Sequence, residues 1–78
     1  MEILKLLILA EVLELLGIGK TKLYGDIQKG LFPPPIKIGV GSRWLASEVQ
    51  ELVRAYTRGA TDAELVLLVN DLVARRKA

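Results

Sequence analysis

Cysteine and histidine are both absent from this 78-residue sequence. Without cysteine, no disulfide can staple the fold and no thiolate can bind a metal ion. Without histidine, the chain lacks the commonest general base and the commonest transition-metal ligand. Glu11, Glu14 and Asp26 are expected to be solvated or helix-stabilising charges, because their spacing does not suggest a catalytic pair. The composition therefore predicts neither an enzyme nor a cofactor.

Long apolar runs are also lacking, since none approaches the roughly 20 residues that a membrane-spanning helix needs. The first segment, MEILKLLILAEVL, is apolar, but Glu2 spoils a basic leader and Glu11 and Glu14 end the run. No cleavage site of small residues follows, so the segment does not read as a signal peptide. Together with the lack of cysteine, this favours a cytoplasmic protein.

The residues that are present suit one small globular domain. Half of them are hydrophobic (51%), with 7 glycines and 3 prolines. A domain of this size buries a modest core, so each apolar face has to be used. The net charge of +2 is a weak indication of an anionic partner.

The first half of the chain has the pattern of a helix-turn-helix. A short strand is expected within Leu4–Ile8. Apolar side chains then recur at helical spacing over Leu9–Leu16. Gly17 is placed to end this helix, since glycine enters the left-handed region freely. A second helix is expected over Lys20–Lys29, with Gly30 ending it. The glycine-containing link of about three residues is typical of the motif.

The second half predicts a hairpin followed by two helices. Three prolines exclude a helix at the start of FPPPIKIGVGSRWL, in which IKI and RWL favour strands and GVGS favours a turn. Ser47 with Gln50 reads as a capping box that opens a helix ending near Gly59. Thr61 with Glu64 reads as a second capping box, opening a last helix that extends to about Arg75.

The stretch GIGKT, from Gly17 to Thr21, resembles the end of a phosphate-binding loop. That motif requires an earlier glycine at the position that Glu14 occupies, where a carboxylate would repel phosphate. The helix-turn-helix explains the same residues better, with Gly19 capping the second helix. Lysines at a helix amino terminus are mildly unfavourable for the helix alone, but they are favourable beside a phosphate backbone.

The order LxxxEVxxLLGIGKTKLYxxIxxGxFPxPIKIGxxxRWxxSEV closely resembles the AlpA-type phage and prophage regulators. These belong with the MerR-like and excisionase-like winged helix-turn-helix domains. The resemblance covers roughly Leu6 to Arg58. It is carried by a series of short motifs in order: Glu11-Val12, Gly17-Ile18, Leu23-Tyr24, Gly30, Phe32-Pro33, Pro35, Gly39, Arg43-Trp44 and Ser47-Glu48-Val49.

The resemblance implies a mainly α fold with a small β-hairpin, that is, a winged helix-turn-helix with an extra carboxy-terminal helix. It implies binding to double-stranded DNA of a prophage or mobile element, as an activator of integrase transcription, an excision directionality factor or both. The helix from Lys20 would enter the major groove and the hairpin would be the wing. Gly19 and Gly25 depart from the serine and arginine common in the family.

Eight residues are candidates for contact with DNA: Lys20, Thr21, Lys22, Tyr24, Lys29, Lys37, Ser42 and Arg43. Thr21 is placed to reach base edges and the lysines to hold phosphates. Tyr24 also has the spacing of a packing residue, and Lys29 and Lys37 could simply aid solubility. The alternative for Arg43 is a salt bridge to Glu48 or Glu51. Trp44 is expected in the core.

The chain divides provisionally into residues 1–58, the DNA-binding domain, and residues 59–78, a carboxy-terminal helix. This helix is apolar on more than one stripe. A homodimer or stacking of copies along DNA would use Leu65, Leu68, Val69 and Leu72. The alternative is a wholly intramolecular helix. Arg75, Arg76 and Lys77 suit the helix dipole better than a DNA contact. A rival function is an adaptor that docks on a recombinase or sensor protein.

Overall fold

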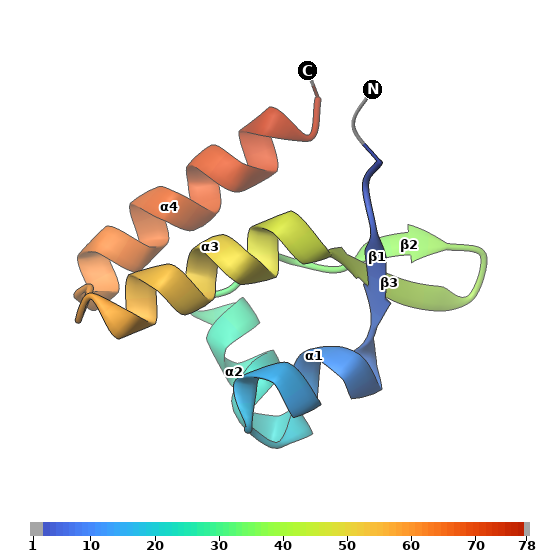
Figure 1. Cartoon of the computed structure of the whole chain (residues 1–78), viewed down its shortest axis with the longest axis horizontal. Helices are drawn as coiled ribbons and strands as arrows, with labels where there is room; N and C mark the ends of the chain where they lie inside the picture. Colours follow the sequence, from blue (N-terminus) through green and yellow to red (C-terminus); the bar gives the residue numbers. More distant parts are fainter. Residues whose placement is uncertain (1–2, 78) are drawn as a thin grey trace.

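The computed structural model describes residues 3–77 and contains four helices and three strands in that range. Figure 1 shows their arrangement, with α3 and α4 side by side and the sheet at one end of α3. In chain order the elements are β1 (Leu6–Ile8), α1 (Leu9–Leu16), α2 (Lys20–Gln28), β2 (Ile36–Ile38), β3 (Gly41–Leu45), α3 (Ala46–Thr57) and α4 (Asp62–Arg75). The predicted mainly helical winged fold is confirmed.

The three strands form one antiparallel sheet in the order β1-β3-β2. The hairpin of β2 and β3 was predicted from the sequence, and β1 pairs with β3 along the other edge. Leu7 lies opposite Trp44, and both side chains are buried. Because side chains alternate between the two faces of a strand, this pair defines the inner face of the sheet.

The link between α1 and α2 closes as the sequence predicts. Gly17 adopts a left-handed conformation with φ of 65°, and its N–H donates to the Leu13 carbonyl at 2.8 Å. Ile18 donates to the same carbonyl at 3.2 Å. These bonds satisfy the open end of α1 and turn the chain sharply. Gly19 is the N-cap of α2, so no side chain covers the start of that helix.

The start of α3 differs from the prediction. Leu45 still pairs with Leu6 in the sheet, and the Ala46 N–H donates to the Lys5 carbonyl at 2.8 Å. The helix therefore begins at Ala46, directly after the strand, with Leu45 as an N-cap that makes no side-chain bond. The capping box predicted for Ser47 with Gln50 is wrong, because sheet pairing sets the boundary two residues earlier than the local signal.

The second predicted capping box is confirmed at the start of α4. The Glu64 N–H donates to Thr61 Oγ1 at 3.2 Å, and the Thr61 N–H donates to Glu64 Oε1 at 3.0 Å. The α4 face built from Leu65, Val69 and Leu72 is buried in the same core as the rest of the chain. The predicted dimer surface of Leu65, Leu68, Val69 and Leu72 is therefore wrong as drawn, since the molecule itself covers three of these residues and Leu68 packs, partly buried, against the same core.

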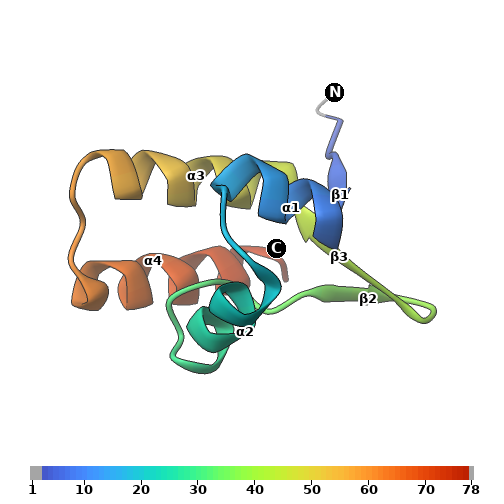
Figure 2. The ribbon, with the colours of Figure 1, turned by 90° about the horizontal axis from the view of Figure 1, so that it is seen from below.

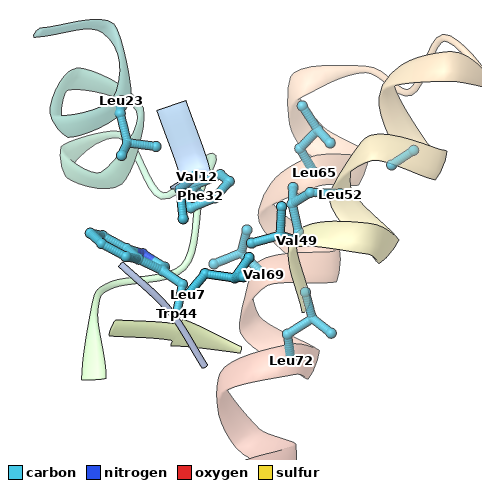
Figure 3. Close-up of a cluster of buried hydrophobic side chains, with 11 residues drawn as sticks. Leu7, Val12, Leu23, Phe32, Trp44, Val49, Leu52, Leu65, Val69 and Leu72 are labelled. Atoms are coloured by element: carbon cyan, nitrogen blue, oxygen red, sulfur yellow. The ribbon is translucent and has the colours of Figure 1, made fainter. Parts of the chain in front are cut away.

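The core lies between the sheet and the helices and centres on Trp44 (Figure 3). Trp44 is fully buried, as predicted, and its Nε1–H donates to the Pro33 carbonyl at 3.1 Å. The close-up shows side chains from every helix and from β1 and β3 converging there. The labelled members are Leu7, Val12, Leu23, Phe32, Trp44, Val49, Leu52, Leu65, Val69 and Leu72.

Candidate nucleic-acid interface

The outward side of α2 carries small and polar side chains. Leu23 is fully buried and Asp26 is 9% exposed, so this side of the helix faces the core. At 3.6 residues per turn, Thr21, Gly25 and Gln28 lie on the opposite side. Gln28 is exposed and was not among the residues predicted from the sequence. Its spacing of seven residues from Thr21 is the signal that places both on one stripe.

The amino-terminal turn of α2 is exposed and positively charged. Lys20, Thr21 and Lys22 are all exposed, as is Lys29 at the other end of the helix. The unpaired N–H groups of a first turn add partial positive charge. Tyr24 is half-buried, which agrees with the mixed packing role predicted for it. Within residues 3–77, neither Lys20 nor Lys29 takes part in an ion pair.

Lys22 differs from the other lysines because its amine is engaged. Its Nζ lies 3.0 Å from Asp26 Oδ1, and the two side chains are 63% and 12% exposed. Asp26 is thus a buried carboxylate in an i,i+4 pair within α2, which agrees with the helix-stabilising role predicted for it and not with the solvated one. Partial burial of the Tyr56 ring and, to a smaller extent, the negative charge of Asp26 together raise the pKa of Tyr56 to about 12. The amine of Lys22 is therefore held beside Asp26.

The β2–β3 hairpin presents Lys37 and Ser42 together. They are cross-strand partners, and Lys37 Nζ donates to Ser42 Oγ at 2.8 Å. Ser42 stands two positions before Trp44 on β3, so the Lys37–Ser42 pair and the Leu7–Trp44 pair both lie on the inner face of the sheet, the one that packs on the helices. Lys37 is exposed beyond the core. The hairpin therefore carries a cation and a hydroxyl group on the face of the sheet that is turned toward the helices.

Arg43 lies on the opposite face of the sheet. Its neighbours across the strands are Ile8 and Ile36, and it is half-buried. Its Nη1 donates to the Ser42 carbonyl at 3.0 Å and lies so close to Gly41 that an added Cβ there would be 2.6 Å away. The structure therefore separates Arg43 from Lys37 and Ser42, with which the sequence grouped it.

The alternative predicted for Arg43, a salt bridge to Glu48 or Glu51, is wrong. These two carboxylates pair with arginines at the end of α4 instead. Arg75 contacts Glu51 and Asp71, and Arg76 contacts Glu48. The basic end of α4 was expected to serve the helix dipole alone. It is instead tied to α3, which local sequence patterns do not reveal.

In Figure 2, α2, α4 and the tip of the β2–β3 hairpin lie below α1 and α3. Six of the eight predicted residues belong to or flank these elements and, within residues 3–77, take part in no ion pair and lie off the outer sheet face: Lys20, Thr21, Tyr24, Lys29, Lys37 and Ser42. Within residues 3–77, no three acidic side chains gather closely enough to hold a metal ion. No helix in that range is long and apolar enough to span a membrane.

Comparison with known proteins identifies one family. The sequence model of the prophage CP4-57 regulatory protein (AlpA) family matches residues 5–56, which run from the residue before β1 almost to the end of α3. No curated protein and no solved structure matches the chain. The family is regulatory, not enzymatic, and has the winged helix-turn-helix fold described above. The chain therefore belongs to the AlpA family of prophage regulatory proteins.

Proposed function

We propose that the protein binds double-stranded DNA, with α2 in the major groove and the β2–β3 hairpin against the sugar–phosphate backbone. One observation carries this proposal. Lys20 and Lys29, at the two ends of α2, are exposed and outside any ion pair of residues 3–77, as is Lys37 on the hairpin. Helix-turn-helix proteins read base edges with such a helix and use the wing for the backbone.

The outward stripe of α2 is suited to close approach. Gly25 stands in its middle, and a Cβ added there would meet nothing within 4 Å. The missing side chain lets the groove floor come near the helix. Thr21 and Gln28 then flank this gap, and a glutamine amide can pair with the N6 and N7 atoms of adenine. Lys20 and Lys29 hold phosphates at either end of the helix.

In biological terms, the protein regulates a prophage or another integrated element from within the cytoplasm, where that DNA lies. It activates transcription of the integrase gene, acts as an excision directionality factor, or does both. An excision factor would also contact the integrase itself. Residues 1–58 contain the DNA-binding surface, and residues 59–78 support it through the shared core. Family membership supports this role.

A second candidate is a protein-interaction adaptor, which would dock on a recombinase or sensor protein. The outer face of the sheet favours it, since Leu6, Ile8 and Ile38 are 38%, 44% and 50% exposed. An exposed apolar patch of this kind is typical of a protein contact. The last helix, which suggested this alternative in the sequence, supports it less because its main apolar face is buried.

Selection from a random pool of DNA duplexes, followed by gel-shift assays with the selected site, tests the proposal. We expect a defined site to emerge, and we expect Thr21→Ala and Gln28→Ala to relax its sequence. Lys20→Ala with Lys37→Ala should weaken the shift strongly without removing it, whereas Leu6→Ser should leave it unchanged. If no site is selected and no duplex shifts, DNA binding is wrong. An adaptor would instead lose its partner on Leu6→Ser.

A further inference from the structure

One side chain from the end of α4 contacts the chain on both sides of the β2–β3 hairpin. Arg76 Nη2 donates to the Pro34 carbonyl at 2.9 Å, and Pro34 stands two residues before β2. The Nε and Nη2 atoms of Arg76 also donate to the two carboxylate oxygens of Glu48, at 2.9 and 2.7 Å. Glu48 stands three residues after β3. One guanidinium thus joins the entry and the exit of the hairpin.

The contact between Arg76 and Glu48 is less exposed and more restricted in geometry than a surface ion pair. The side chains of Arg76 and Glu48 are 16% and 5% exposed, and the guanidinium binds the carboxylate with two parallel bonds. Bidentate pairs of this kind restrict geometry as well as adding energy. Arg75, its neighbour, is 53% exposed and contacts only carboxylates of α3 and α4. Arg75 therefore provides a natural control for Arg76.

The segment that Arg76 holds connects α2 to the hairpin. Residues 33–35 are all proline and have no N–H, so hydrogen bonds can hold this segment only through its carbonyls. Trp44 binds the Pro33 carbonyl from the core, and Arg76 binds the Pro34 carbonyl from α4. The path of this segment determines where the hairpin stands relative to α2.

Apolar packing at the base of the hairpin is incomplete. A groove of about 600 Å³ opens there, lined by Ile36 and Leu45 of the sheet and Leu72 of α4, with Arg76 and Glu48 among its other walls. Contacts across a void are lost, so side-chain packing alone fixes the hairpin base weakly. At this groove, the hydrogen bonds of Arg76 connect Pro34, before the hairpin, with Glu48, after it.

We propose that Arg76 is a positioning residue for DNA binding, because it fixes the orientation of the β2–β3 hairpin relative to α2. The inference rests on the proposed function, in which both elements contact one duplex. Arg76 lies beyond the residues that the family model matches, so α4 adds this control to the matched segment. Its effect on DNA acts through Lys37 on the hairpin, and Arg76 itself does not touch the duplex.

A double-mutant cycle tests the proposal with the selected duplex and fluorescence anisotropy. Arg76→Lys keeps the charge but loses the planar fork that serves two partners at once. We expect Lys37→Ala to weaken binding about fivefold in the unaltered chain and less than about twofold in the Arg76→Lys background, since coupled sites are not additive. Thr21→Ala should cost the same in both backgrounds. Arg75→Lys should leave the effect of Lys37→Ala unchanged. Equal effects of Lys37→Ala in all three backgrounds would overturn the proposal.

NMR provides a second test that needs no DNA, and its first measurement needs no variant. In the unaltered chain, the Arg76 Nε–H should exchange slowly with water while that of Arg75 exchanges fast, because only the former is buried in its pair. Equal exchange would overturn the contact. In Arg76→Lys, the β2 and β3 amides should exchange faster while those of α2 do not. If no duplex binds, the proposed function fails, but these exchange rates still decide the role of Arg76.

Discussion

The salt dependence of DNA binding tests the interface closely, because the structure identifies which cations can meet phosphate. Three exposed lysines form no ion pair within residues 3–77: Lys20 and Lys29 at the two ends of α2, and Lys37 on the hairpin. Each phosphate neutralised on duplex DNA contributes about 0.9 to the slope of log affinity against log salt. Three lysines therefore predict a slope of about −2.7, or a loss of about 40-fold in affinity between about 50 and about 200 mM salt.

The double variant Lys20→Ala with Lys37→Ala should leave one of these contacts. Its slope should be about −0.9, and its affinity should fall about 3.5-fold over the same range. Unfolding does not explain such a loss, because removing a lysine from the positive end of α2 favours the helix slightly. Fluorescence anisotropy at four salt concentrations measures both slopes with the same labelled duplex.

Arg43→Ala is the matched control, since this variant removes a cation from the same hairpin but from the outer face of the sheet. Its slope should equal that of the unaltered chain. The reasoning is refuted if the double variant keeps the full slope, or if Arg43→Ala lowers the slope as much as Lys37→Ala does. The second outcome would place the DNA on the other face of the sheet.

The remaining predictions concern stability, measured by urea unfolding with circular dichroism. Thr61→Ala should cost about 1 kcal/mol because it breaks a real capping box, whereas Ser47→Ala should change stability by less than about 0.5 kcal/mol. Trp44→Phe should cost about 1–3 kcal/mol, since the buried Pro33 carbonyl loses its hydrogen bond from the indole N–H and the phenyl ring fills less of the core. Gly25→Ala should raise the free energy of unfolding by about 1 kcal/mol, because alanine has the higher helix propensity and its Cβ would meet no other atom within 4 Å. The raised Tyr56 pKa of about 12 means that the unfolded chain, with the usual value of 10.0, loses this proton first. The free energy of unfolding should therefore fall as pH rises from 10.0 toward 12, with the phenol titration followed by NMR.

Local signals made much of the fold predictable. Gly17 marks the end of α1 because a left-handed residue is needed there, and Thr61 with Glu64 marks the start of α4. Both signals depend on residues a few positions apart. Ser47 with Gln50 has the same form and failed, because pairing of β3 with β1 had already fixed the chain at Leu45. A boundary set by a distant strand leaves no trace in the local pattern.

The candidate site was predictable in composition but less so in geometry. The exposure of Lys20 and Thr21 follows from helical spacing alone. The separation of Arg43 from Lys37 follows from alternation along β3, which can be counted once the register is known. The pairing of Arg76 with Glu48 joins residues 28 positions apart and has no periodic signature. The apolar surplus of α4 suggested a dimer surface because the depth of the core between α3 and α4 was not visible in the sequence.

The pairing of β1 with β3 has a consequence for synthesis of the protein. Leu6 meets Leu45 only after the whole helix-turn-helix between them has been made (Figure 1). Contacts so distant in sequence form late, since a long loop must close first. A nascent chain leaving the ribosome can therefore form α1 and α2 as local helices, but it cannot fix them against the sheet until the last hairpin strand emerges. A fragment that stops before β3 should remain only loosely ordered.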